Sequence, residues 1–376
     1  MTSPMRALFL CGLPRSGPSS RPRVYEHADR LRARGFEIDV RPFLSERAWS
    51  RFYDRSPLAT VRKAVGSALG LLRRRSHLAT ATKRYDVVLV HRELVPRGNR
   101  RAVARLGGVP WVYDFDDSIW LAPRDYVAEG DASQRRMVRF KDPAEVDDLI
   151  RAATLVLAGN ETLAQHARPL ARAAEAVEVV PTAVDVERLR PREKPPRGAR
   201  PVVGWIGSPT ATYCLREILP ALEAVAARRP LRLVAVGAGE DLRSGSGALE
   251  IESRPWSLAR EADDLAGFDI GLYPLPDNEW TRGKCGYKAL QYFAAGVPAV
   301  VAPVGVNAML AGDGARALAA TTAAEWTEAV ARLLDDEVLA RGLATRARAY
   351  VVERFSYEAI TPLVERALRR AAEGAR

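Results

Sequence analysis

Three cationic side chains, those of Arg282, Lys284 and Lys288, gather where a polar stretch passes into a predicted helix. Lys284 and Lys288 stand at positions i and i+4, which a helix places on one face. The apolar residues that follow predict a buried helix, in which a lysine needs an anionic partner. A diphosphate fits, because its charge also suits a helix N-terminus. Gln291 would lie on the same side and could bind a ribose hydroxyl; a solvated cationic face is the alternative.

A second candidate for phosphate binding is the turn at Gly207, Ser208 and Pro209, which follows an apolar strand and precedes a helix. Gly207 lets the backbone approach a ligand closely, and the free N–H groups of the helix N-terminus attract a phosphate. Hydroxyls at Ser208 and Thr210 add hydrogen-bond donors. An ordinary turn, capped by a serine or threonine, explains the same residues equally well.

Three carboxylates, those of Asp114, Asp116 and Asp117, stand at the end of another predicted strand. They could bind a metal, act as a base or hold sugar hydroxyls, whereas helix capping explains such acids about as often. The loop 14–23 holds arginines that could meet a phosphate, and His91 ends a strand, although an exposed loop and a merely hydrogen-bonded histidine are the simpler explanations. The sequence has no Gly-x-Ser-x-Gly elbow, no Walker lysine loop and no Gly-x-Gly-x-x-Gly after its first strand.

Two sets of strands alternating with helices must position these residues. Apolar runs of the kind that parallel sheets bury on both faces occupy residues 7–10, 36–40, 85–90, 110–115, 154–158 and 178–180. Residues 188–201 hold four prolines without apolar periodicity and read as a linker. The pattern then restarts, with strands predicted at 202–206, 232–236, 268–273 and 299–302 and helices at 211–228, 287–295 and 323–334. The sequence therefore predicts two α/β domains.

The composition is that of an ordinary globular protein, with 47% hydrophobic and 27% charged residues in 376. Three scattered cysteines argue against a disulfide framework or a thiolate zinc site. The N-terminal apolar run is too short for a signal peptide, and no run of about 18 apolar residues would span a membrane. We therefore expect a cytoplasmic protein.

Positive charge is concentrated in the first half of the sequence. Of the net charge of +11, residues 1–190 supply most, with 33 basic and 23 acidic residues. Residues 55–84 carry eight basic side chains and no acid, interleaved with apolar residues. Such a basic amphipathic helix suits peripheral contact with the inner face of an anionic membrane. A solvated basic helix explains the same residues about as well.

Several motifs resemble those of the group 1 glycosyltransferases, the retaining family 4 enzymes of the GT-B fold. In the second half of the chain the motifs are Gly204–Pro209, Phe268–Leu275, Lys284–Lys288, Tyr292–Pro298 and Pro303–Gly305; in the first half they are Ser20–Val24, Gly159–Glu161 and Val180–Asp185. The resemblance spans nearly the whole chain. It implies an α/β, GT-B architecture of two Rossmann-like parallel-sheet domains that face a cleft.

The implied domain boundaries follow from the resemblance and the linker together. Residues 1–187 would bind the acceptor, 188–201 would form the linker, and 202–355 would bind the nucleotide sugar. Residues 356–376 would form a C-terminal helix that crosses back to the first domain. Enzymes of this family need no metal ion, because protein cations hold the diphosphate, so we expect no cofactor beyond the donor substrate.

The chain departs from the family at its Glu-x7-Glu motif, whose two acids are replaced by Gly283 and Gln291. We therefore expect cationic side chains to hold the diphosphate and Gln291 to bind the ribose through its amide. The expected catalytic residues are Lys284, Lys288, Asp116 and Asp117. The expected donor-binding residues are Gly207, Ser208, Pro209, Arg282 and Gln291, with Pro255 and Trp256 near the base.

Together with these residues, the resemblance implies a hexosyltransferase of polysaccharide or glycoconjugate synthesis. It would move a sugar from a nucleotide-diphospho-sugar to a glycan, lipid-linked or small-molecule acceptor, with retention of configuration. One alternative is a nucleotide-sugar epimerase or hydrolase on the same fold, although the missing glutamates weaken its acid–base chemistry. The other is a non-catalytic basic protein that binds anionic lipid or nucleic acid. We expect no nucleic-acid partner, because no recognised nucleic-acid module is present.

Overall fold

The chain folds as two compact units in a computed structural model, which describes residues 4–52, 56–121, 142, 144–192, 198, 200–239, 242 and 248–374. The first unit comprises the residues up to Thr182 together with those from Tyr357 onward, and the second comprises Ala183–Ser356. Each unit is built around one parallel sheet, so the predicted α/β class with two Rossmann-like domains is confirmed.

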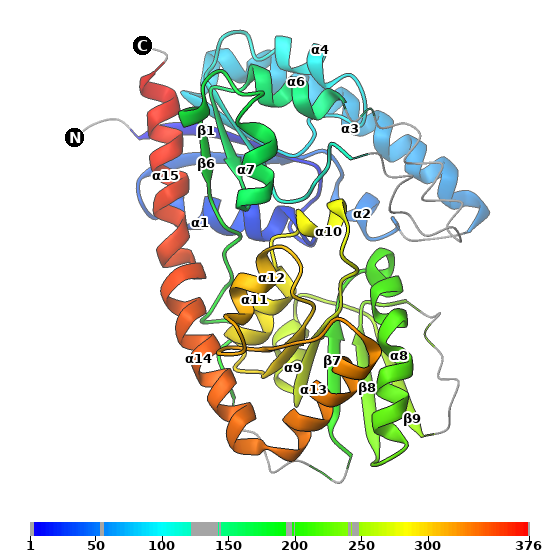
Figure 1. Ribbon diagram of the computed structural model, residues 1–376. Coiled ribbons are helices and arrows are strands. Elements are labelled where there is room, and N and C mark those ends of the chain that lie inside the picture. Colours follow the sequence, from blue (N-terminus) through cyan, green and yellow to red (C-terminus); the bar gives the residue numbers. More distant parts are fainter. Residues whose placement is uncertain are drawn as a thin grey trace. The chain divides into compact units, whose positions relative to one another are not determined.

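The sheet of the first unit has six parallel strands in the order β2-β1-β3-β4-β5-β6 (Figure 1). The strands are β1 (Met5–Cys11), β2 (Phe36–Pro42), β3 (Val87–His91), β4 (Trp111–Phe115), β5 (Leu155–Ala158) and β6 (Val177–Val179). The central strands β3, β4 and β5 are buried along their whole length, because helices cover both faces of such a sheet. The order reverses between β1 and β3, which makes their carboxyl ends the natural ligand site of this sheet.

The helices of the first unit come from both ends of the chain. They are α1 (Glu26–Arg32), preceded by one π-helical turn (Arg21–Tyr25), α2 (Glu46–Trp49), α3 (Pro57–Arg84), α4 (Asn99–Ala104), α6 (Ala144–Ala152), α7 (Glu161–Ala167) and α15 (Tyr357–Glu373). The C-terminal helix α15, red in Figure 1, packs on α1 and against β3 and β4. Its buried face includes Ile360, Val364 and Leu368, which recur at helical spacing.

The second unit has the strand order β12-β11-β10-β7-β8-β9, again all parallel. Its strands are β7 (Val202–Ile206), β8 (Leu231–Val236), β9 (Leu249–Arg254), β10 (Ile270–Tyr273), β11 (Ala299–Val301) and β12 (Leu318–Ala319). Its helices are α8 (Thr212–Ala226), α9 (Glu261–Ala266), α10 (Glu279–Arg282), α11 (Tyr287–Ala294), α12 (Val306–Ala311), α13 (Ala323–Asp335) and α14 (Glu337–Phe355). In this sheet the strand order reverses between the neighbouring strands β7 and β10.

The division between the units falls at Thr182, earlier than the predicted end of the first domain at residue 187. Val184 forms a parallel bridge with Ser356, and Val186 and Leu189 lie in the core of the second unit. These apolar side chains, rather than the proline content that follows them, determine where the second core begins. Within the predicted linker 188–201, residues 193–197 and 199 lie outside the described residues.

A buried imidazole joins the two ends of the chain in the first unit. His27 is 1% exposed; its Nδ1 lies 3.0 Å from the hydroxyl of Thr361, and its ring meets the ring of Tyr357 edge-on. Burial, reinforced by the charge of Arg23, lowers the pKa of His27 to about 3. The folded protein therefore keeps this imidazole neutral at pH values where the unfolded chain protonates it.

We predict that the protein loses stability as the pH falls and that the variant His27→Gln loses less. Below pH about 6.5 the unfolded state binds one proton more than the folded state at this site, so stability falls with falling pH, by roughly 1.4 kcal/mol per unit, until the folded pKa is reached. Thermal melting of both proteins at pH 7, 6, 5 and 4 tests this. The variant should show the shallower decline; parallel curves would contradict the assignment.

Candidate functional site

The candidate site of the second unit lies at the carboxyl ends of β7 and β10, where the strand order reverses. Lys288, in the first turn of α11, projects its ammonium group over two aromatic rings, 4.9 Å from the centroid of Tyr273 and 5.7 Å from that of Trp205. A Cβ atom on Gly207 would lie 3.0 Å from Cε of Lys288. The structure thus brings together Gly207 and Lys288, which are far apart in the sequence.

Gly207 has no room for a side chain. A Cβ atom there would also overlap the indole of Trp205, which is 1% exposed and fixed in the core. On its other side, a Cβ on Gly237, after β8, would meet the carbonyl oxygen of Gly207. The backbone of two turns, the indole of Trp205 and the side chain of Lys288 therefore pack against one another here, and glycine is required at both turns.

We predict that Gly207→Ala weakens binding of a nucleoside diphosphate about tenfold or more, because the methyl group must displace either Trp205 or Lys288. Calorimetric titration of the variant and the wild type measures this. Gly198→Ala is the matched control, because nothing lies within 4 Å of a Cβ at that position. Equal affinities in all three proteins would show that the close approach has no bearing on the ligand.

Lys284 does not share a helix face with Lys288, which corrects the expectation from their spacing. Helix α11 begins only at Tyr287, and its N-cap residue Gly286 has a left-handed φ of 70°, which breaks the helical path between the two lysines. Lys284 lies in the preceding turn, with its ammonium group 5.0 Å from the ring of Trp280. Both lysines are half-buried at the N-terminal end of α11.

Arg282, the third cation, is tied to an acid. Its guanidinium makes two hydrogen bonds to Asp277, at 2.6 and 3.1 Å, and both side chains are more than half exposed. Ser208 and Pro209 follow Gly207 in the turn, where the hydroxyl of Ser208 lies 2.8 Å from that of Thr210. The positive charge close to Gly207 therefore comes from Lys288 rather than from Arg282.

A buried carboxylate that the sequence did not indicate organises the other side of the site. Glu261, at the start of α9, is 1% exposed and accepts hydrogen bonds of 3.0 Å from the indole of Trp256 and from the amide of Gln291. Arg188 forms an ion pair with it. Trp256 also lies beside Gly237, 3.3 Å from the position of a Cβ there, while Pro255 is exposed. Glu261 therefore holds in place two of the residues expected to contact the nucleoside.

The sequence gives no spacing that would identify Glu261. Its partners come from the loop after β9, from α11 and from the segment before β7, and only the fold unites them. The indirect signal was Gln291, whose amide is 3% exposed and therefore needs a partner. Because Nε2 of Gln291 donates to Glu261, its amide oxygen is the atom oriented by this contact.

The first unit has a separate polar cluster at the carboxyl ends of β1, β3 and β4. Asp114, 2% exposed, forms an ion pair with Arg23 and accepts a hydrogen bond of 2.7 Å from Nδ1 of His91. Nε2 of His91 lies 3.0 Å from the hydroxyl of Ser19. Burial alone would raise the pKa of Asp114, but the Arg23 charge and the His91 hydrogen bond outweigh it and hold the pKa well below its usual range.

Asp114 therefore does not face a ligand, contrary to the expectation for a strand-end acid. It is a buried anchor that connects the loop after β1 with the ends of β3 and β4. Asp116 and Asp117 are half-buried, and both contact the guanidinium of Arg92; Nε of Arg92 lies 2.6 Å from Asp116. Arg92 has a φ of 60°, a conformation that a non-glycine residue rarely adopts, so these ion pairs fix an otherwise unfavourable turn.

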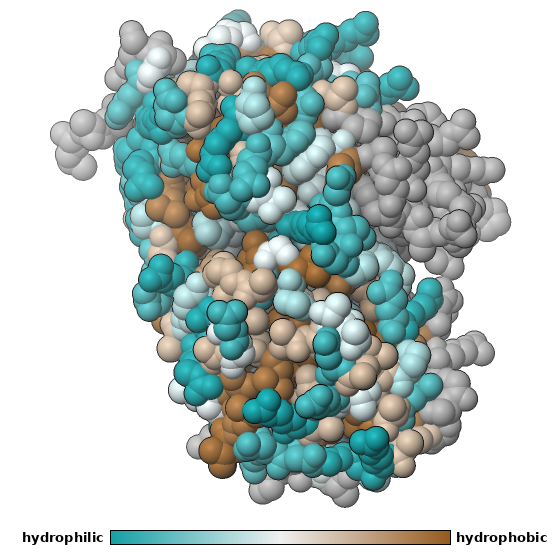
Figure 2. Space-filling view, viewed as in Figure 1, coloured by the Kyte–Doolittle hydropathy of each residue, from teal (hydrophilic) through white to brown (hydrophobic). Residues whose placement is uncertain are grey.

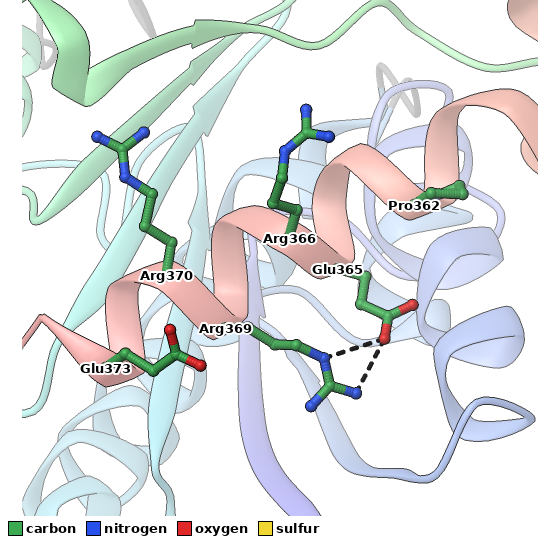
Figure 3. A pocket seen from close by; sticks show the side chains of 6 residues that line it. All are labelled: Pro362, Glu365, Arg366, Arg369, Arg370 and Glu373. Carbon is green, nitrogen blue, oxygen red and sulfur yellow. Dashed lines mark hydrogen bonds and ion pairs between the residues drawn. The ribbon is translucent and has the colours of Figure 1, made fainter.

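Two surface hollows in the described part of the chain have other linings. One, in the first unit, runs along α15, where Arg369 bonds to Glu365 and the neighbouring arginines point away from that pair (Figure 3). Another, of about 130 Å³, lies beside β10 and β11 of the second unit and includes Glu217, whose pKa burial raises. Among the described residues, no group of three or more histidine, cysteine or acidic side chains is arranged to hold a metal ion.

The comparison with protein families concerns the second unit. A family model described as "Glycosyl transferases group 1" matches residues 200–336, which lie in the second unit and include Gly207, Glu261, Lys288 and Gln291. A search of curated protein sequences finds no match.

Solved structures match nearly the whole chain at low sequence identity. HepE of Anabaena in complex with UDP-glucose has a TM-score of 0.66 at 16% identity, covering 97% of this chain and 100% of its own. Sucrose-phosphate synthase from Thermosynechococcus elongatus has a TM-score of 0.66 at 15% identity, with 98% and 100% covered. A UDP-forming α,α-trehalose-phosphate synthase from Burkholderia xenovorans has 0.63 at 13%, with 98% and 99% covered. The chain therefore has the GT-B fold, and its residues 200–336 carry the signature of the group 1 glycosyl transferases.

Proposed function

We propose that this protein is a retaining glycosyltransferase of hexosyl type that uses a nucleotide-diphospho-sugar donor. The observation that carries the proposal is the position of Lys288, held against the Gly207 turn at the N-terminus of α11 within the region that matches the group 1 glycosyl transferases. The positive end of the helix dipole and the half-buried ammonium groups of Lys284 and Lys288 lie at the N-terminal end of α11, and a diphosphate is a ligand that suits both.

The proposed reaction breaks the bond between the sugar C1 and the oxygen of the diphosphate. The bonding electrons pass to the departing diphosphate, and an acceptor hydroxyl forms the new bond on the same face of the sugar while its proton passes to an oxygen of the departing diphosphate. The leaving group gains negative charge as the bond breaks, so Lys288 and Lys284 stabilise the transition state more than the bound substrate. Asp116 and Asp117, fixed by Arg92, are proposed to accept hydrogen bonds from hydroxyls of the sugar or acceptor.

Trp256, Pro255 and Gln291 are proposed to hold the nucleoside. Glu261 fixes the indole of Trp256 and the amide of Gln291, which would bring a flat ring to the base and an amide oxygen to the ribose hydroxyls. Ser208 and Pro209 would line the turn at the phosphates. Because protein cations supply the charge, we propose that donor binding needs no metal ion, and binding should survive excess EDTA.

The test of the proposal is a titration of the full chain with UDP, GDP, ADP and TDP in EDTA, followed by thermal shift and calorimetry. UDP is the first nucleotide to examine, because HepE was solved with UDP-glucose and the Burkholderia enzyme is named as UDP-forming. Binding of one diphosphate should select the sugar donors to screen, and the anomeric configuration of the product then tests retention. Binding of none would refute a nucleotide-sugar enzyme, the alternative epimerase and hydrolase included.

We further propose that the first unit contacts an anionic membrane through α3. This helix of 28 residues presents an apolar stripe, defined as Leu58, Val61, Val65, Leu69 and Leu72, whose exposed fractions are 61, 61, 53, 52 and 61%. Exposed basic side chains flank it at Arg62, Arg73, Arg75, Lys83 and Arg84, and the helix contains no acid. Arg74, by contrast, is 1% exposed and donates to the backbone carbonyls of Cys11, Arg41 and Leu94, which fixes the helix to the sheet.

The described surface otherwise exposes few large apolar side chains; in Figure 2, hydrophilic side chains predominate over α4 and α6. No helix in the described ranges is both long and apolar enough to cross a bilayer. The stripe therefore suits contact with the membrane surface, where apolar side chains enter the interface and basic ones meet anionic headgroups. Such contact would favour a lipid-linked acceptor.

Cosedimentation with phosphatidylglycerol vesicles tests the membrane contact. We expect Leu69→Ser combined with Leu72→Ser to reduce the vesicle partition coefficient about tenfold, because two leucines that enter the membrane interface contribute more than about 1 kcal/mol to partitioning. Val338→Ser is the control, since Val338 is 75% exposed on α14 of the second unit. Equal vesicle binding by the wild type, the double variant and the control would refute the proposal. A double variant that still binds vesicles but no longer self-associates would refute it as well.

A further inference from the structure

The loop between β11 and α12 closes over the N-terminus of α11. Gly305 has a φ of 56°, and a Cβ there would overlap the carbonyl oxygen of Arg282, so the two backbones are in direct contact. Gly286, the N-cap residue of α11, meets helix α12, which follows this loop: a Cβ on Gly286 would overlap Leu310 and lie 3.2 Å from Val306 and 3.4 Å from Oδ1 of Asn307. The side chain of Asn307 is therefore placed at the N-terminus of α11.

Asn307 is a buried polar side chain with an unused donor. It is 1% exposed, and its amide nitrogen Nδ2 has no hydrogen-bond partner within the part of the chain that the structure describes. A buried amide without a partner destabilises a folded protein, and folded proteins satisfy almost all such groups. Among the described asparagines, Asn99 illustrates the usual case: it is equally buried, and both ends of its amide are hydrogen-bonded.

We infer that Asn307 belongs to the donor site and donates a hydrogen bond to an anionic oxygen of the nucleotide diphosphate. This rests on the proposed function. An NH₂ group requires an acceptor, and the nearby N-terminus of α11 favours an acceptor that is negatively charged. Phosphoryl oxygens meet both requirements, whereas a water molecule meets only the first. The bound diphosphate supplies the partner that the free protein lacks.

The inference also accounts for the strained turn at Gly305. Since a Cβ there would overlap the backbone of Arg282, the loop must approach the Arg282–Gly286 turn closely, and only glycine allows this. The close approach brings Asn307 to Gly286.

The test compares Asn307→Leu and Asn307→Ala with the wild type, using free UDP as the probe and the melting temperature without ligand as a second readout. Leucine has nearly the shape of asparagine but leaves no unpaired donor. We expect the unliganded Asn307→Leu protein to melt at the wild-type temperature or above it, while the Kd for UDP rises about tenfold in both variants. Asn99→Ala is the control: it should lower the melting temperature and leave the Kd unchanged, because Asn99 bonds only within the first unit.

The outcomes separate this inference from the proposal on which it rests. If the wild type binds UDP and both Asn307 variants bind it within twofold of the wild type, the inference is wrong and the glycosyltransferase proposal stands. If both variants only lose melting temperature, as Asn99→Ala should, Asn307 is structural and the inference is again wrong. If the wild type binds none of the four nucleoside diphosphates, the proposed function fails and the inference fails with it.

Discussion

Replacement of Lys288 by alanine is expected to lower turnover about 10²–10³-fold, the effect of removing one preorganised group that stabilises developing charge. The ammonium group sits over Tyr273 and Trp205 beside the Gly207 turn, which is the position proposed for the leaving diphosphate. Its attraction grows with the charge on the diphosphate. The larger part of the loss should therefore appear in kcat and a smaller part in the Kd for UDP.

Arg282→Ala is the matched comparison for Lys288→Ala. Arg282 is exposed and already bonded to Asp277, so its removal should change turnover less than about tenfold. Both proteins should melt near the wild-type temperature, because both side chains are at least partly in solvent. A wild-type rate in Lys288→Ala would remove this lysine from the mechanism, and a larger loss in Arg282→Ala would transfer its role to Arg282.

The fold was predictable because buried parallel strands are recognisable as short apolar runs. Val202–Ile206 was predicted with the observed limits, and Trp111–Phe115 and Leu155–Ala158 to within a residue at each end. The site turn at Gly207 was predictable for the same reason, since it follows such a strand directly. The boundary between the units was less accurate, because Val186 and Leu189 join the second core although their sequence resembles a linker.

The side-chain contacts were not predictable, because they depend on residues brought together only by the fold. Lys284 and Lys288 have helical spacing, but the left-handed Gly286 separates them. Asp114 has the position of a strand-end ligand, yet Arg23, from the π-helical turn before α1, pairs with it in the core. Glu261 is an unremarkable acid in the sequence and becomes the partner of two site residues only in the folded protein. For Asp114 and Glu261 a contact between separate segments overrides the local pattern, and for the two lysines a left-handed glycine does so.

Replacement of Asp114 by alanine is expected to destabilise the first unit by about 3–5 kcal/mol, because it leaves Arg23 buried and uncompensated. Both side chains are at most 3% exposed, so water cannot take over the lost interaction. His91 loses the partner of its Nδ1 in the same step. By contrast, Asp148→Ala removes an ion pair with the 78%-exposed Arg100 and should change stability by less than about 1 kcal/mol.

Hydrogen exchange of the β3 and β4 amides measures this loss within the first unit, without requiring the two units to unfold together. The double variant Arg23→Met/Asp114→Leu should recover most of the protection, because removing both charges leaves neither of them unpaired. The pH dependence supplies a second criterion. The folded pKa of Asp114 is depressed, so its stabilising contribution is complete above pH about 4, the unfolded value, and is lost as the pH falls towards the folded pKa. Wild-type protection should therefore fall more steeply below pH 4 than that of Asp114→Ala, and curves of equal slope would contradict a buried ion pair.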